Sequence, residues 1–148
     1  RDAEGEPYIE KMREELSFLA YFPQITAIET EADLLHAWAA KADPSAEEEA
    51  LALYERAMSI DRWNPILRAK AADSYIELGR EADALARLLP LAGENVPFAR
   101  YWGTLAFVHA RLGDEAEAEE AATKAFAIDP RDPRALQAVD LLSAVPRA

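Results

Sequence analysis

The sequence repeats itself with a period of 34 residues, and this period limits the possible folds more than any other feature. The segment "YIELGREADALARL", beginning at Tyr75, resembles "VHARLGDEAEAEEA", beginning at Val108, because the pair Leu-Gly and the alanines after it recur 34 positions apart. One further step upstream places Ala50 in the position of those alanines, although Ser45 stands where the glycine would be. A period of this length predicts a stack of similar structural units.

Each unit has the pattern of two antiparallel helices joined by a tight turn. In the third unit, apolar residues recur at three- and four-residue spacing between Phe98 and Leu112, as on the buried face of a helix. Gly113 is suited to end that helix in a left-handed conformation, and Asp114 is suited to start the next one. The first unit replaces this turn with Ser45 and Glu48, which form a capping-box pattern.

Alanine recurs on one face of every second helix, where we expect the paired helices to approach closely. The positions are Ala50, Ala84 and Ala118. An accidental pattern in an alanine-rich chain is the alternative, and the recurring Leu-Gly pairs argue against it. The third unit contains further characteristic residues in order: Trp102, Leu105, Gly113, Ala118, Ala125 and Pro130.

With these residues the chain resembles the tetratricopeptide repeat (TPR) family, whose 34-residue pattern spaces Trp, Leu, Gly, Tyr, Ala, Phe, Ala and Pro in this way. The resemblance implies an all-α, right-handed solenoid of antiparallel helical hairpins. It predicts three repeats, at residues 31–64, 65–98 and 99–132. The first repeat is the weakest match, with Trp38 at a normally small position and Arg62 in place of the closing proline.

Additional helices are expected at both ends of the repeats. Residues 1–30 are predicted to be an N-terminal helical extension, with an amphipathic helix over 7–22 that Pro23 stops. That helix could cap the first repeat, or its apolar face could bind a partner. Residues 133–148 are predicted to be a capping helix and tail, since a repeat stack exposes an apolar end unless another helix covers it. Pro90 should end the second helix of the second repeat.

Composition argues against several functional classes. The net charge of −12 should repel nucleic-acid phosphates and anionic lipid, and no apolar stretch approaches the roughly 20 residues of a membrane-spanning helix. The chain lacks cysteine, and its two histidines, His36 and His109, lie in different repeats. The acidic runs suit solvated helix starts better than metal binding. We therefore expect no enzyme activity, no cofactor and no metal.

The resemblance implies that the first helices of the repeats line a concave face that binds a protein or peptide. Placing the 34-residue register on the sequence predicts these partner-binding residues: Leu35, His36, Ile66, Lys70, Asp73, Ile76, Glu77, Arg100, Thr104, Phe107 and Arg111. Lys70, Arg100 and Arg111 are expected to form a basic cluster beside apolar anchors, which predicts a partner segment with apolar and acidic character. The alternative is an ordinary solvated face with scattered charges.

The function implied is that of a non-catalytic protein–protein interaction module, an adaptor or accessory subunit of a larger assembly. The alternative is a regulatory or positioning domain of a longer bacterial enzyme, because the segment "DRWNP…ELGREADAL" is similar to repeats appended to polysaccharide-assembly proteins. The compartment stays open between bacterial periplasm and cytoplasm, with the periplasm slightly favoured.

Overall fold

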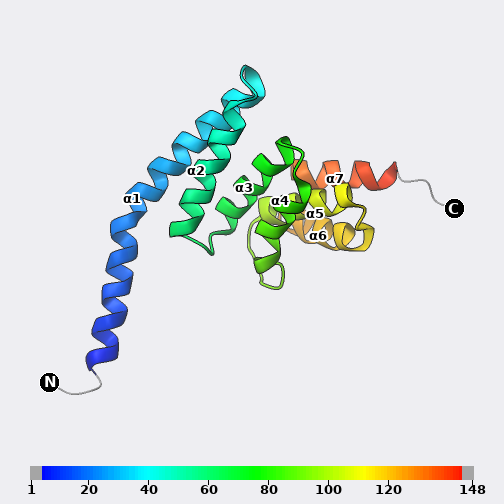
Figure 1. Cartoon of the computed structure of the whole chain (residues 1–148). Helices are drawn as coiled ribbons and strands as arrows, with labels where there is room; N and C mark the ends of the chain where they lie inside the picture. Colours follow the sequence, from blue (N-terminus) through cyan, green and yellow to red (C-terminus); the bar gives the residue numbers. More distant parts are fainter. Residues whose placement is uncertain (1–4, 145–148) are drawn as a thin grey trace.

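The architecture is entirely helical over the part of the chain that is described. The structure, a computed structural model, describes the backbone of residues 5–144 and the side chains of residues 22–144. Figure 1 shows successive helices stacked side by side, with α1 at one end of the stack and α7 at the other. The elements are α1 (Gly5–Lys41), α2 (Ala46–Ile60), α3 (Pro65–Glu77), α4 (Glu81–Leu88), the 3-10 helix η1 (Leu89–Leu91), α5 (Ala99–Leu112), α6 (Glu115–Ile128) and α7 (Pro133–Ser143).

The helices pack as consecutive hairpins, α1 with α2, α3 with α4 and α5 with α6. Neighbouring hairpins contact each other through α2 with α3 and through both α3 and α4 with α5, while α7 covers α5 and α6. Each hairpin therefore contacts mainly its neighbours in sequence, as in a repeat protein. The prediction of an all-α helical-repeat solenoid is confirmed.

The same turn chemistry closes the second and third hairpins. Gly79 and Gly113 have φ angles of 72° and 84°, in the left-handed region that residues with a Cβ rarely adopt. The amide of the following residue donates to a carbonyl five positions back, from Arg80 to Tyr75 and from Asp114 to His109, at 2.8 Å in both cases. This Schellman geometry satisfies carbonyls that a helix end would leave unpaired.

Small side chains let the paired helices approach. Ala50, Ala84 and Ala118, which recur at the 34-residue period, are all fully buried. Larger side chains at these positions would overpack the hairpins, at a cost of roughly 1–3 kcal/mol. The predicted role of the alanine positions agrees with this burial.

The second hairpin is the irregular one, as Pro90 predicts. Helix α4 ends at Leu88, and η1 with a loop leads to α5. The Tyr101 hydroxyl donates to the carbonyl of Leu88, and the Trp102 indole donates to the carbonyl of Val96 at 2.8 Å. Two buried aromatic residues of α5 thus hold the irregular connection in place.

The prediction that Pro23 stops the N-terminal helix is wrong. Helix α1 runs through Pro23 to Lys41, so the expected boundary at residue 30 falls inside a helix. Pro23 is exposed, so water can solvate the carbonyl that loses its hydrogen bond, and Ile25 and Ile28 pack into the core directly after it. This burial offsets the roughly 3 kcal/mol that proline costs inside a helix.

The capping box predicted at Ser45 and Glu48 is also absent. Ser45 precedes α2, but its hydroxyl donates to Asp43 Oδ1 at 2.6 Å and makes no side-chain cap bond to the helix. Asp43 also accepts the backbone amide of Ser45 at 3.1 Å. The aspartate therefore organises this turn, and the serine hydroxyl is occupied by it.

Candidate partner-binding surfaces

Helices α1, α3 and α5, which begin the three hairpins, form one side of the stack together with α7. We call this side the first-helix face. Its charged residues join helices that are distant in sequence. The ammonium of Lys70 on α3 lies 2.8 Å from Asp33 and 2.9 Å from Glu29, both on α1. The same Asp33 accepts the Tyr54 hydroxyl at 2.5 Å. Ion pairs thus tie the first hairpin to the second.

A second charge network joins α3, α5 and α7. The buried carboxylate of Asp73 accepts from Arg100 at 3.2 Å and from Arg134 at 3.1 Å, and Arg134 also reaches Glu77 at 3.3 Å. These groups border an open hollow of about 500 Å³ that Asp132, Pro133 and Gln137 complete. Because Asp73 is buried between two guanidinium groups, its charge is compensated within the protein.

Helix α7 approaches this hollow because Gly103 has no side chain. A Cβ atom on Gly103 would lie 2.7 Å from Asp132 Cγ and nearer still to Oδ2. Asp132 caps α7 by accepting the amide of Ala135 at 3.0 Å. Burial raises the pKa of Asp132 above its usual value, against the lowering effect of this backbone hydrogen bond. Gly103 therefore decides how closely the cap of α7 sits on α5.

The structure distributes the eleven predicted partner-binding residues unevenly. Three are exposed (Glu77, Arg100 and Arg111), four are partly buried (Leu35, His36, Ile66 and Lys70) and four are buried (Asp73, Ile76, Thr104 and Phe107). Buried Ile76 and Phe107 belong to the hydrophobic core, so they are not the accessible anchors that we expected. The guanidinium of Arg134 covers the Phe107 ring at 4.5 Å. Helix α7, whose position the sequence pattern does not specify, thus contributes to the burial of Phe107.

The expected basic cluster is replaced by separate ion pairs. Lys70 pairs with α1, Arg100 with Asp73, and Arg111 with Glu81 at 2.8 Å. The cations therefore face acidic partners of the chain itself. Asp132 and Arg134 were missed by the sequence reasoning, although Asp132 directly precedes Pro133, a typical signal for a capped helix start.

His36 belongs to a hydrogen-bonded cluster of side chains that joins α1, α2 and α3. Its Nδ1 lies 2.8 Å from Glu47 Oε2, and the same oxygen accepts the hydroxyl of Ser74 at 2.8 Å. Glu47 is buried, so it needs both contacts to offset its desolvation. His36, one of the predicted partner-binding residues, thus helps to compensate the buried charge of Glu47.

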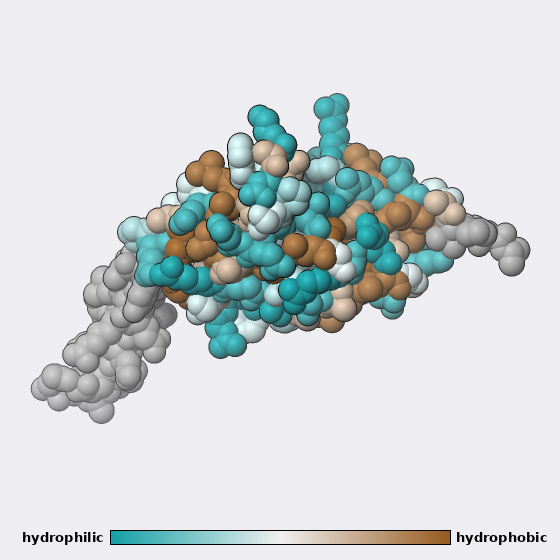
Figure 2. All heavy atoms as spheres, turned by 45° about the horizontal axis from the view of Figure 1, so that its top comes forward, coloured by the Kyte–Doolittle hydropathy of each residue, from teal (hydrophilic) through white to brown (hydrophobic). Residues whose placement is uncertain are grey.

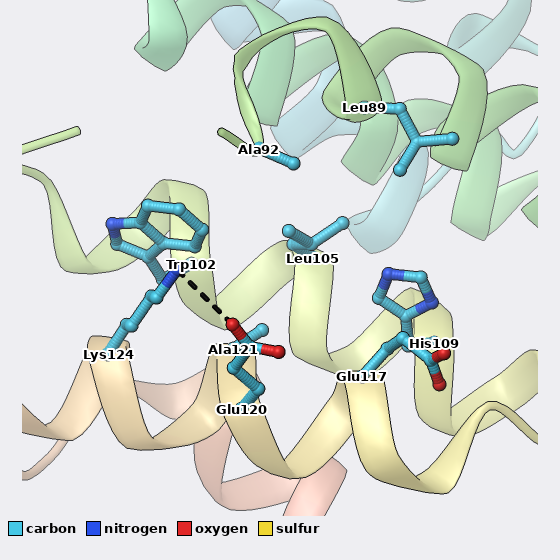
Figure 3. A pocket seen from close by; sticks show the side chains of 9 residues that line it. All are labelled: Leu89, Ala92, Trp102, Leu105, His109, Glu117, Glu120, Ala121 and Lys124. Atoms are coloured by element: carbon cyan, nitrogen blue, oxygen red, sulfur yellow. Dashed lines mark ion pairs between the residues drawn. The ribbon is translucent and has the colours of Figure 1, made fainter. Parts of the chain in front are cut away.

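A smaller hollow of about 210 Å³ lies where α4 is cut short (Figure 3). Trp102 and Leu105 of α5 line the bottom of this hollow. The 3-10 helix η1 and the loop after it line one side, and α6 lines the opposite side. Lys124 lies 4.4 Å from the centre of the Trp102 ring and 3.6 Å from Glu120. The hollow is smaller than the roughly 300–1,000 Å³ of typical small-molecule pockets.

The comparison with protein families shows which family this chain belongs to. Two models described as tetratricopeptide repeat match the chain, one at residues 46–108 and the other at residues 99–132. Together they run from the start of α2 to beyond the end of α6. The chain belongs to the tetratricopeptide repeat family.

Tetratricopeptide repeats generally mediate protein–protein interaction and are generally non-catalytic. Figure 2 shows hydrophilic residues interspersed with small hydrophobic areas on the face that it displays. Within the described side chains, no group of three or more His, Asp or Glu residues is arranged to hold a metal ion. None of the helices described combines the length and hydrophobicity needed to cross a bilayer.

Proposed function

We propose that this tetratricopeptide repeat chain is an adaptor or accessory subunit that holds a segment of a partner protein on its first-helix face. The observation that carries the proposal is the charged hollow between α3, α5 and α7. Two side chains at its border extend into solvent, since Arg100 is 45% exposed and Glu77 is 51% exposed. A partner segment can reach both.

Arg100 is the group that a partner would use first. A guanidinium carries five N–H donors, and one Arg100 nitrogen contacts Asp73 at 3.2 Å. The remaining donors suit a carboxylate, which guanidinium groups bind with two parallel hydrogen bonds. The partner segment we propose is therefore acidic. The apolar part of the expected segment has weaker support, because Ile76 and Phe107 are buried.

The test is a pull-down from the native source with the whole 148-residue chain, followed by cross-linking mass spectrometry. Arg100→Gln removes the proposed carboxylate contact without adding charge beside Asp73. Arg56→Gln is the matched control, since Arg56 is an exposed arginine on α2. We expect Arg100→Gln to weaken capture by roughly tenfold, as for the loss of about 1.4 kcal/mol, and the control to bind as wild type.

Circular dichroism must first show equal helicity in both variants. Cross-links of the partner should then map to α3, α5 and α7. A partner that binds the Arg100 variant as tightly as wild type, with cross-links concentrated on α2 and α6, would refute the assignment of the first-helix face.

A further inference from the structure

Arg68 on α3 has a buried positive charge without an acidic partner. The residue is 8% exposed. Its Nε donates to the carbonyl of Arg62, and one of its terminal nitrogens donates to the carbonyl of Arg87, at 2.7 Å in both cases. Among the described residues, no carboxylate forms an ion pair with Arg68. Two carbonyls compensate a buried charge less well than an anion does, so this guanidinium favours a negatively charged ligand.

Arg68 lines an open hollow of about 480 Å³ between α2, α3 and α4, which we call the arginine hollow. Arg62 from the connection after α2 and Arg87 from α4 also line it, and Glu55 contributes a carboxylate. Arg87 Nε lies 2.6 Å from Glu55 Oε1, so these two charges compensate each other. With three arginines against one glutamate among the described lining residues, the hollow has an excess of two positive charges, in a chain whose net charge is −12.

The next repeat has a hollow at the equivalent place without the arginines. Trp102 and Ala121 line the hollow in Figure 3. They lie 34 positions after Arg68 and Arg87. Trp102 donates to the carbonyl of the residue six positions earlier at 2.8 Å, as Arg68 does at 2.7 Å. A neutral indole can therefore hold this connection in place, so the repeat fold does not require the positive charge of Arg68.

The ring of Trp63 brings the two arginines of the hollow that lack an acidic partner close together. The guanidinium carbon of Arg62 lies 5.6 Å from the ring centre, and that of Arg68 lies 5.3 Å from it, which is within cation–π range. Burial lowers the pKa of Arg68, and the positive charges of Arg62 and Arg87 add to this lowering. An anion bound between the guanidinium groups would relieve this repulsion.

We propose that the arginine hollow binds a dianionic phosphate group, either as free phosphate or on a phosphorylated side chain. A phosphorylated side chain carries a charge of about −1.5 to −2 at pH 7, which matches the excess of two positive charges. Guanidinium groups bind phosphate oxygens through parallel N–H donors. The lining residues are distinct from those of the hollow between α3, α5 and α7, so this site is independent of the binding site for an acidic segment proposed above.

NMR spectroscopy of the whole chain tests the site. The probes are inorganic phosphate and N-acetyl-phosphoserine methylamide, added at constant ionic strength and about pH 7.5, where a phosphate monoester is mostly dianionic because its second pKa is about 6. Trp63 contacts both arginines, so its indole N–H signal should shift and saturate. The indole of Trp102, in the equivalent hollow, is an internal control and should not shift in parallel. A titration without a saturable shift at Trp63 would overturn the proposal.

Two variants test the role of the arginines. Arg62→Gln leaves the backbone carbonyl that Arg68 contacts in place, and we expect it to weaken phosphate binding by roughly tenfold. Arg68→Trp reproduces the residue of the next repeat and should show no saturable binding. Arg131→Gln is the matched control, because Arg131 is an exposed arginine in the connection before α7. If Arg62→Gln binds phosphate as tightly as wild type, with equal helicity by circular dichroism, the proposal is wrong.

Comparing the probes distinguishes the two sources of phosphate. The arginine hollow of about 480 Å³ has room for part of the residue that carries the phosphate. We therefore expect N-acetyl-phosphoserine methylamide to bind at least as tightly as inorganic phosphate, whereas tighter binding of inorganic phosphate would assign the site to the free ion. N-acetyl-glutamate methylamide has a single negative charge and should bind roughly tenfold more weakly than the phosphoserine probe. Equal binding of the glutamate probe would overturn the assignment to phosphate.

Discussion

Replacing Gly103 by alanine tests how α7 is positioned over the first-helix face. In most helix interiors this change stabilises a protein by roughly 1 kcal/mol, because glycine loses more backbone entropy on folding. Here the new Cβ would lie 2.7 Å from Asp132 Cγ and 3.2 Å from the amide nitrogen of Ala135. Such contacts are too short for the cap of α7 to stay in place.

The expected effect follows from three contributions. Alanine gains about 1 kcal/mol of helix propensity. Displacing Asp132 from the Ala135 amide removes a helix cap worth about 1 kcal/mol, and overpacking between α5 and α7 costs roughly 1–3 kcal/mol. We therefore expect Gly103→Ala to lower the free energy of unfolding by about 1–3 kcal/mol.

Urea unfolding followed by circular dichroism measures this change, provided that the slope with denaturant stays constant. In an Asp132→Ala background the main clash is absent, so Gly103→Ala should become neutral or stabilising, and the double-mutant cycle should show coupling. Gly93→Ala is the control, because a Cβ there meets nothing within 4 Å. If Gly103→Ala stabilises the otherwise wild-type chain, the steric reasoning is refuted.

Two further predictions concern buried polar groups near the same helices. The Thr104 hydroxyl is buried without a hydrogen-bond partner among the described residues, so Thr104→Val should leave the thermal midpoint unchanged or raise it, and a marked drop would contradict the assignment. Burial raises the pKa of Asp132, so the folded state binds its proton more tightly than the unfolded state does. The wild type should therefore lose stability relative to Asp132→Asn as the pH rises from about 4 through the raised pKa. Urea unfolding of both proteins at several pH values measures this. A difference in their free energies of unfolding that does not change with pH would contradict the prediction.

Local chemistry explains which features of the fold could be predicted. Gly79 and Gly113 sit in left-handed turns, and Pro65 and Pro133 open helices, because these residues act through their own backbone geometry. The exception at Pro23 shows the limit of this reasoning. Burial of Ile25 and Ile28 outweighs the local preference of proline, and burial depends on the whole hairpin.

The candidate binding surface was predictable in outline only. The register placed Lys70, Asp73 and Arg100 on one face, and the structure does bring Asp73 and Arg100 together at 3.2 Å. It also joins Asp73 to Arg134, which lies 61 residues away in sequence. No periodic pattern specifies such a pair, because it depends on the angle at which α7 returns over α5.

The sequence by itself determined the repeat, the helical hairpins and the close-packed alanines, since these follow from spacing and backbone preference within 34 residues. Only the tertiary structure decided which charges are compensated and which side chains stay accessible. Phe107 and Thr104 are buried, while Leu34 and Trp38 remain in water. The physical reason is that exposure depends on what the neighbouring hairpin, or its absence, places over each helix.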